Sequence, residues 1–255
     1  MKITFLGTGT SHGIPMIGCD CAVCRSTDPR DRRYRASIAL QTNTGEVILI
    51  DTPPELRLAV IENKISRVDA VLFTHAHADH IVGLDDLRRF NDIIGASISC
   101  YGNERTIKTL RQCFGYAEVP YQQAAMYRPS LQFNVIDAPS LKIFDLEIIP
   151  VPLMHGVDEI LGFRIGNFAY CTDCSGIPEK SLALLEDLDV LVIGALRHEP
   201  HPAHFSLSEA LEAISQLKPK RAFLTHISHH LPHHATEQTL PENVRLAYDG
   251  LVLEV

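Results

Sequence analysis

The sequence predicts an α/β fold built from two similar halves whose β-sheets pack face to face. Short apolar runs, which are typical of buried strands, alternate with helical patterns along the 255 residues. Residues 69–87 and residues 189–211 each run strand, histidine-rich loop and helix, so the two halves echo one another. No linker composition interrupts the chain. We therefore expect one domain over residues 1–255, a size that is common for single α/β domains.

Composition and charge limit the classes of partner. The chain is 45% hydrophobic and carries a formal net charge of −8, whereas a nucleic-acid surface needs clustered Lys and Arg, and only residues 30–35 form such a cluster. No apolar run approaches the ~18 residues of a membrane span, and the first residues lack the features of a signal peptide. The seven cysteines are odd in number and clustered, which favours metal ligands and buried thiols over disulfides. We expect a cytoplasmic protein with no membrane partner.

The elements follow in order from apolar runs, turn residues and caps. In the first half, these signals predict strands at residues 2–6, 36–41, 46–50, 68–73 and 97–101, and helices at 53–63, 82–92 and 104–114. In the second half, they predict strands at 131–136, 142–152, 162–165, 167–170, 188–194 and 221–225, and a helix that begins at the capping box Ser206-Leu207-Ser208-Glu209. Residues 7–10 predict a tight turn, and residues 115–130 show no period that indicates an element.

The seven residues after the 68–73 strand, Thr74-His75-Ala76-His77-Ala78-Asp79-His80, give the strongest chemical signal. Alternate side chains of an extended segment share a face, so His75 and His77 can hold one cation, while Asp79 and His80, past the turn, point toward a second. This is the pattern of a two-metal hydrolytic site. A histidine-rich surface loop is the alternative, and we disfavour it because the string is specific and directly follows a β-branched strand.

Three further strand ends carry side chains that could bind a metal or orient a metal ligand. His155 lies where a third nitrogen for the first metal is needed. Asp51 either orients a ligand imidazole through its N–H or caps the helix at 53–63. The segment Cys171-Thr172-Asp173-Cys174 offers either a cysteine pair for metal or redox chemistry or a carboxylate for the two-metal site.

A cysteine cluster near the N-terminus predicts a separate metal site. Cys19, Cys21 and Cys24 offer three thiolates within six residues, a spacing that lets one loop wrap a tetrahedral zinc. A closed structural site needs a fourth ligand from elsewhere in the chain. The alternative is that the three cysteines are reduced surface thiols.

Together these motifs resemble those of the metallo-β-lactamase superfamily over nearly the full chain, and H-x-H-x-D-H is the signature of that superfamily. The combination resembles more narrowly the PhnP-like phosphoribosyl cyclic phosphodiesterases: an early C-x-C-x-x-C, T-H-x-H-x-D-H, a Thr-Asp strand end, a late histidine loop, Thr-His-Ile-Ser-His and Tyr-Asp-Gly. The resemblance implies a four-layer αββα sandwich, with two β-sheets packed face to face and helices outside. It also implies a metal-dependent hydrolase.

Carried over motif by motif, the resemblance implies ligands for three metals. His75, His77 and His155 would hold one catalytic metal, Asp79, His80 and His226 the other, and Asp173 would bridge the two, while Cys19, Cys21, Cys24 and His229 would hold a structural zinc. His204 takes the place of the catalytic histidine, with His198 and His201 as rivals in the same loop, and Asp79 joins it in the catalytic set. Cys171 and Cys174 stay unassigned. His230, His233 and His234 are expected to be exposed loop residues.

The implied chemistry is the hydrolysis of a phosphodiester. Two divalent cations, manganese or zinc or else iron, lower the pKa of a shared hydroxide, and they attract an anionic ester because two carboxylates neutralise only half of their charge. The hydroxide attacks phosphorus, and His204 as general acid protonates the leaving alkoxide. We expect the substrate to be a small cyclic or linear phosphate ester that resembles a phosphoribosyl cyclic phosphate or a nucleotide. Nucleic acid is not an expected partner, and a homodimer is the assembly to test for.

Three other functions share parts of this pattern. A tRNA 3′-processing endonuclease is disfavoured by the negative net charge and by the lack of a long basic insertion in the sequence. A non-catalytic, metal-stabilised interaction module is disfavoured because every ligand position is filled. Thioester or β-lactam hydrolysis uses the same ligand set, so only substrate assays separate it from phosphodiester hydrolysis.

Overall fold

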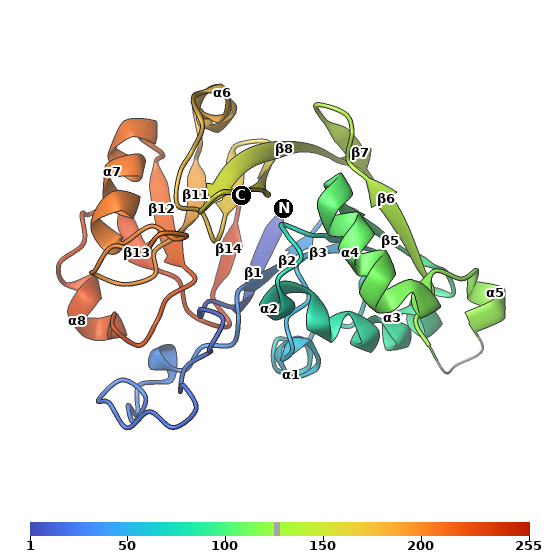
Figure 1. Cartoon of the computed structure of the whole chain (residues 1–255), viewed down its shortest axis with the longest axis horizontal. Coiled ribbons are helices and arrows are strands. Elements are labelled where there is room, and N and C mark those ends of the chain that lie inside the picture. Colours follow the sequence, from blue (N-terminus) through green and yellow to red (C-terminus); the bar gives the residue numbers. More distant parts are fainter. Residues whose placement is uncertain (125–127) are drawn as a thin grey trace.

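The computed structural model describes residues 1–124 and 128–255 and places two seven-stranded β-sheets between two groups of helices (Figure 1). The strands of the first sheet are, in spatial order, β14 (Val252–Glu254), β1 (Lys2–Gly7), β2 (Ser37–Gln41), β3 (Val47–Ile50), β4 (Ala70–Leu72), β5 (Ile98–Gly102) and β6 (Leu131–Val135). From β3 to β6 neighbouring strands are parallel, and from β14 to β3 they are antiparallel.

The second sheet repeats this arrangement. Its strands are, in spatial order, β13 (Val244–Leu246), β12 (Arg221–Thr225), β11 (Val190–Gly194), β10 (Phe168–Cys171), β9 (Asp158–Ile165), β8 (Leu146–His155) and β7 (Leu141–Ile143). Strands β10 to β13 are parallel, and β7 to β10 are antiparallel. The predicted echo between the halves has a structural counterpart, because β4 and β11 each lie between two parallel neighbours.

Helices cover the outer face of each sheet (Figure 1). The helices beside the first sheet are α1 (Leu56–Glu62), α2 (Ala78–Ile81), η2 (Val82–Leu87), α3 (Arg88–Ile94), α4 (Glu104–Phe114), η3 (Gly115–Ala117) and α5 (Tyr121–Ala124). The helices of the second half are α6 (Glu179–Leu182), η4 (Ala183–Leu185), α7 (Leu207–Leu217) and α8 (His233–Glu237), and a single 3-10 turn, η1 (Pro29–Asp31), lies in the N-terminal loop. No helix among the described residues combines the length and apolar character that crossing a bilayer requires.

The core explains the four layers. Successive side chains of a strand point to opposite faces, so a strand that is apolar throughout can be buried on both. In β3, Ile48 packs between the sheets with Phe163 of the second sheet, whereas Leu49 packs outward with Leu56 of α1. A third cluster joins the second sheet to α7. The predicted αββα sandwich is confirmed.

Two predicted elements are divided in the structure. The helix expected at residues 82–92 is interrupted, because the Gly83 N–H donates to the Thr52 carbonyl oxygen and a Cβ at Gly83 would lie 2.0 Å from the Pro53 oxygen. The expected helix therefore runs as η2 and α3, and the short α2 precedes it. The strand expected at 142–152 turns at Phe144, whose φ is +55°, and forms the β7–β8 hairpin.

Two further expectations about local structure were wrong in part. Residues 7–10 are extended, and the turn follows at residues 11–12. Glycine is needed at position 7 because the backbone of Arg35 lies very close: a Cβ at Gly7 would be 1.9 Å from the Arg35 carbonyl oxygen. Residues 115–130, where no element was expected, contain η3 and α5, while residues 125–127 lie outside the described part. In contrast, the capping box at Ser206 is confirmed at the start of α7.

Candidate metal centre

Strand ends from both sheets place the predicted ligands together. The Thr74–His80 segment follows β4, His155 ends β8, and Asp173 and His226 lie just past β10 and β12. His75, His77 and His155 each offer a ligand atom within 4.8 Å of the others, and so do Asp79, His80, Asp173 and His226. The structure thus gathers all seven predicted residues of the two-metal site in two adjacent sets.

The Asp173 carboxylate lies between the two sets. Its Oδ2 is 3.3 Å from His80 Nε2 and 3.1 Å from His226 Nε2 in one set, and 3.9 Å from His75 Nε2 in the other. The carboxylate is only 2% exposed. One oxygen atom facing imidazoles of both sets is the geometry that a bridging ligand needs.

The orphaned nitrogens of these rings fit metal binding. Within the described residues, the Nε2 atoms of His75, His80 and His226 are buried and have no hydrogen-bond partner. A buried polar atom without a partner is destabilising, and such atoms are rare in folded proteins. One cation in each of the two sets would satisfy all three nitrogens, so the residues present fit divalent metals.

Hydrogen bonds from neighbouring groups orient two of the rings. The Asp51 Oδ2 atom lies 2.7 Å from His80 Nδ1, and the same carboxylate accepts bonds from the Thr74 N–H (2.9 Å) and hydroxyl (2.8 Å). His155 Nδ1 donates to the Asp173 carbonyl oxygen at 2.6 Å. Such bonds leave Nε2 free for a metal. Asp51 therefore orients an imidazole, and α1 begins without a side-chain cap.

The charge balance of the site favours bound cations. Burial lowers the pKa of the His75 and His77 imidazoles, so both rings are neutral, the form that binds metal. At His80 burial acts against the charge, but the carboxylates of Asp173 and Asp51 raise the pKa of the ring well above its ordinary value. The protein alone thus balances its buried carboxylates with an imidazolium. A divalent cation supplies that positive charge directly.

Three residues of the site have left-handed backbone conformations. The φ angles are +65° at Asp51, +57° at Asp173 and +56° at His226. This region is uncommon for residues other than glycine, although aspartate and histidine are among the residues that adopt it most often. Strained conformations of this kind persist where the surrounding structure holds them, often at functional sites.

The late histidine loop brings His204, and not His198, to the site. His204 offers a ring nitrogen within 4.8 Å of ligand atoms of His155 and Asp173. Its ring centroid is 4.7 Å from that of His155 and 4.7 Å from that of His226, on which it stacks. His201 lies 5.0 Å from His204 between ring centroids, and His198 is exposed.

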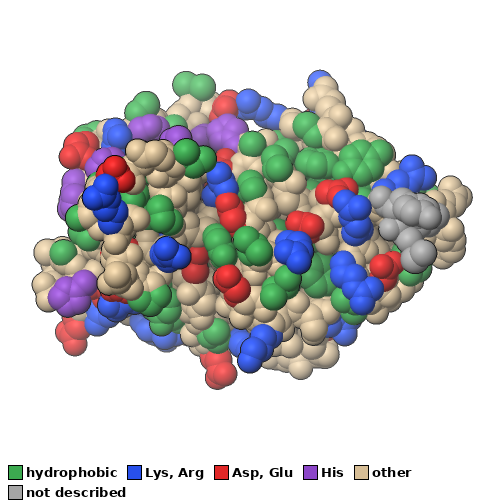
Figure 2. All heavy atoms as spheres, turned by 90° about the horizontal axis from the view of Figure 1, so that it is seen from below, with side chains coloured by type: hydrophobic (Ala, Val, Ile, Leu, Met, Phe, Trp, Pro, Cys, Tyr) green, Lys and Arg blue, Asp and Glu red, His purple; other side chains and the backbone are tan. Residues whose placement is uncertain are grey.

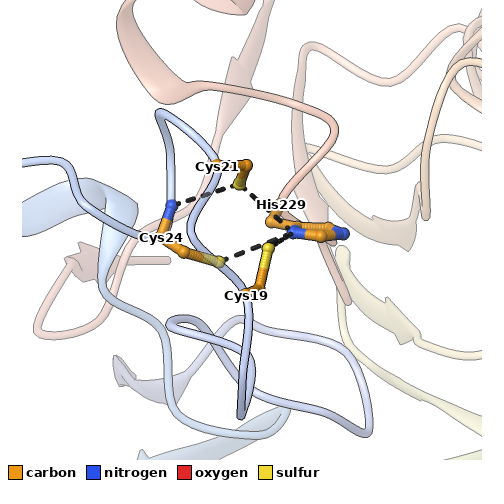
Figure 3. Close-up of side chains that lie close together, drawn as sticks. All are labelled: Cys19, Cys21, Cys24 and His229. Atoms are coloured by element: carbon orange, nitrogen blue, oxygen red, sulfur yellow. Dashed lines mark hydrogen bonds between the residues drawn. The ribbon is translucent and has the colours of Figure 1, made fainter.

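The cysteine loop meets His229 in a separate cluster (Figure 3). The Sγ atoms of Cys19, Cys21 and Cys24 lie 3.2, 3.4 and 3.5 Å from His229 Nδ1. The Cys24 N–H donates to Cys21 Sγ and lowers the pKa of that thiol to about 6, which favours the thiolate that binds zinc. Three sulfur atoms around one nitrogen fit a tetrahedral zinc site, and His229 comes from the turn after β12.

Two cavities open beside the two-metal set. The larger, about 390 Å³, lies between residues 10–16, the histidine loop and the turn after β12, and its lining includes Ser11, His12, Arg197, His201 and His204. The smaller, about 120 Å³, lies on the side of His75 and His155 next to Arg105. Several histidine side chains gather at the surface on the face drawn in Figure 2.

Sequence reasoning missed two features near the site. Thr74 was noted only as part of the motif, yet its hydroxyl links Asp51 to His75 Nδ1, which lies 3.0 Å away. His233 is not an exposed loop residue, because it is 2% exposed, accepts a bond from Arg33 and packs edge-on against Tyr248. His230 and His234 are exposed as expected. The local pattern around His233 gave no signal of burial, since its partners lie far away in the sequence.

The fold and the candidate metal centre together are those expected of the beta-lactamase superfamily. Residues 46–227 match the family described as beta-lactamase superfamily domain. A crystal structure described as a new diphosphatase from the PhnP family is 43% identical, with a TM-score of 0.93, over 100% of this chain and 97% of that one. The chain therefore belongs to the beta-lactamase superfamily and is PhnP-like, which confirms the resemblance seen in the motifs.

Other relatives extend the comparison. A protein named octanoyltransferase from Porphyromonas gingivalis is 35% identical over 98% of this chain but only 51% of its own length, so the chain spans about half of that relative. The zinc-bound PqqB structure from Methylobacterium extorquens shares the fold, with a TM-score of 0.80, 18% identity and full coverage of both chains. The short form of human tRNase Z also shares it, with a TM-score of 0.73 and 19% identity over 100% of this chain and 99% of that one.

Proposed function

We propose that this protein is a two-metal phosphodiesterase that hydrolyses a small cyclic or linear phosphate ester. The observation that carries the proposal is the Asp173 carboxylate between two complete ligand sets, His75, His77 and His155 on one side and Asp79, His80 and His226 on the other. The ligands come from both halves of the chain. We accordingly propose that residues 1–255 act as one hydrolase domain.

The ligand chemistry suits Mn²⁺ or Zn²⁺, and also iron, since imidazole and carboxylate bind all three. Cations in these two sets would supply Lewis acidity for a phosphoryl group and activate water for attack. The thiol-rich cluster is different, because three sulfur ligands and one nitrogen favour zinc. We propose two catalytic cations and one structural zinc, held by Cys19, Cys21, Cys24 and His229.

We assign His204 the role of protonating the leaving group. Burial and the neighbouring His226 lower the pKa of His204 to about 3, so its ring is neutral in the free protein. A phosphate anion bound beside the ring favours the imidazolium and raises that pKa. The protonated ring can then donate its proton to the departing alkoxide oxygen.

The cavity next to His204 supports a small leaving group. Its volume of about 390 Å³ holds a sugar-sized molecule, and Arg197 and His201 offer donors for hydroxyl or anionic groups. The formal net charge of −8 also supports a small ester over a nucleic acid.

A substrate panel tests the proposal. Purified protein would be assayed with bis-p-nitrophenyl phosphate, cyclic ribose phosphates, nucleotides, an acyl thioester and a precursor tRNA, and the variant Asp173→Asn would serve as the negative control. We expect hydrolysis of the cyclic ribose phosphates and the p-nitrophenyl ester, and loss of both activities in the variant. Hydrolysis of the thioester or the tRNA alone would contradict the proposed function.

A further inference from the structure

A buried charged side chain contacts Thr8, the residue that follows β1. Arg33 is among the largest side chains with less than 2% exposure in the described residues. Its Nη1 donates to the Thr8 hydroxyl at 2.7 Å and to the Ala247 carbonyl oxygen at 2.5 Å, and its Nη2 donates to His233 Nδ1 at 3.0 Å. Burying a guanidinium is unfavourable unless it is well bonded, so this position calls for a reason beyond packing.

Thr8 connects Arg33 to the backbone next to His226 through hydrogen bonds. Its hydroxyl accepts a bond from Arg33 and donates one to Asp249 Oδ1 at 2.7 Å, while the other Asp249 oxygen accepts from the Tyr34 N–H at 2.6 Å. The backbone beside Thr8 is paired with Ile227, since the Ile227 N–H donates to the Thr8 carbonyl oxygen at 2.9 Å and the Thr10 N–H donates to the Ile227 oxygen at 3.0 Å. The side chain of Thr8 is thus held on the segment Thr8–Thr10, whose backbone pairs with Ile227, the residue after His226.

His226 needs such support more than the other buried ligands do. His75, His80 and His155 each have an Nδ1 atom in contact with an oxygen of Thr74, Asp51 or Asp173. Within the described residues, the Nδ1 atom of His226 has no hydrogen-bond partner, while its Nε2 atom faces Asp173. Its backbone is left-handed, with φ at +56°. The orientation of its ring therefore depends on how firmly the neighbouring backbone is held.

We propose that Arg33 is a positioning residue for His226, acting through the Thr8 hydroxyl and the paired backbone of Ile227. The inference rests on the proposed function, because it treats His226 as a metal ligand. It also gives a role to two sequence features that the proposed chemistry leaves unused. These are the basic cluster at residues 30–35 and the Tyr248-Asp249-Gly250 motif.

The test measures cobalt(II) affinity by calorimetry, with visible absorption as the signature of ligand geometry. Thr8→Val removes the hydroxyl while keeping the shape, and Thr8→Ser keeps the hydroxyl. Each is combined with His77→Ala, which leaves the His226 ligand set intact, and with His226→Ala, which removes the supported ligand. In the His77→Ala background we expect Thr8→Val to weaken cobalt binding roughly 10- to 100-fold, the usual effect of removing support behind a ligand.

The other variants decide between positioning and a general structural role. Thr8→Ser should bind cobalt nearly as the parent does, and Thr8→Val should cause no further loss in the His226→Ala background. Arg33→Met should reproduce the Thr8→Val pattern, whereas Arg30→Gln, which removes an exposed partner of Asp28 in the same basic cluster, should change nothing. Equal losses in both backgrounds, or no loss in either, would overturn the inference. Failure of the His77→Ala parent to bind cobalt would overturn the inference and the proposed function together.

Discussion

Replacing Asp51 by asparagine should weaken one metal site without unfolding the protein. The Asp51 carboxylate is fully buried and accepts bonds from the Thr74 N–H, the Thr74 hydroxyl and His80 Nδ1. Asparagine keeps the shape and tolerates the left-handed backbone at φ +65°. However, one of its two terminal groups is an N–H donor, so with its oxygen on the Thr74 N–H it faces His80 Nδ1 with a donor.

The magnitude follows from the tautomer of His80. Two donors cannot face each other, so the neutral ring of His80, the form that binds metal, carries its one proton on Nε2 instead of Nδ1. This Nε2 atom lies 3.3 Å from both Asp79 and Asp173. A protonated Nε2 cannot bind a metal. We expect the affinity of the Asp79–His80–His226 set to fall by roughly 10- to 100-fold, which corresponds to about 1.4–2.7 kcal/mol.

Metal content after dialysis against buffers of fixed free Mn²⁺ or Zn²⁺ measures this change. Asp69→Asn is the matched control, because Asp69 also accepts a backbone N–H bond, from Val47, and lies at the other end of β4. The control should lose stability without losing metal affinity. Equal metal affinity in Asp51→Asn and the parent protein would refute the tautomer argument.

Three further predictions test other parts of the site. His204→Ala should lower turnover by roughly 10²–10⁴ for an alkoxide leaving group and much less for p-nitrophenolate, and equal losses in steady-state assays would indicate a role in binding instead. Cys21→Ser and His229→Ala should each lose one zinc per chain by elemental analysis and melt at a lower temperature, and a His229→Ala protein that keeps its full metal content would contradict the four-ligand cluster. Ser206→Ala removes the capping box of α7 and should lower the free energy of unfolding by about 1 kcal/mol in urea titrations, whereas an unchanged midpoint would contradict this role of the cap.

Local patterns in the sequence predicted much of the fold and of the site. The run 47–50 is apolar at every position, and the structure buries β3 on both faces. The spacing in Thr74–His80 was sufficient to divide four candidate ligands between the two sets that the structure shows, because extended and turning backbone point side chains in definable directions. The capping box at Ser206 depends on four neighbouring residues, so it was visible in the sequence.

Features that depend on distant contacts could not be predicted. The break at Gly83 arises from its contact with Thr52 and Pro53, which belong to another segment. The burial of His233 arises from Arg33, 200 positions earlier in the chain. Each of these contacts exists only after the two sheets have packed, and no local propensity encodes it.

The most direct test of the central claim is a titration of metal-depleted protein that retains its structural zinc. Mn²⁺ or Zn²⁺ would be added in steps, while bound metal and hydrolysis of bis-p-nitrophenyl phosphate are measured on the same samples. The account predicts that activity rises to its maximum at about two further equivalents, and that Asp173→Asn, which alters the shared ligand, lacks this maximum. Full activity at one equivalent, or full activity in Asp173→Asn, would contradict a two-metal site bridged by Asp173.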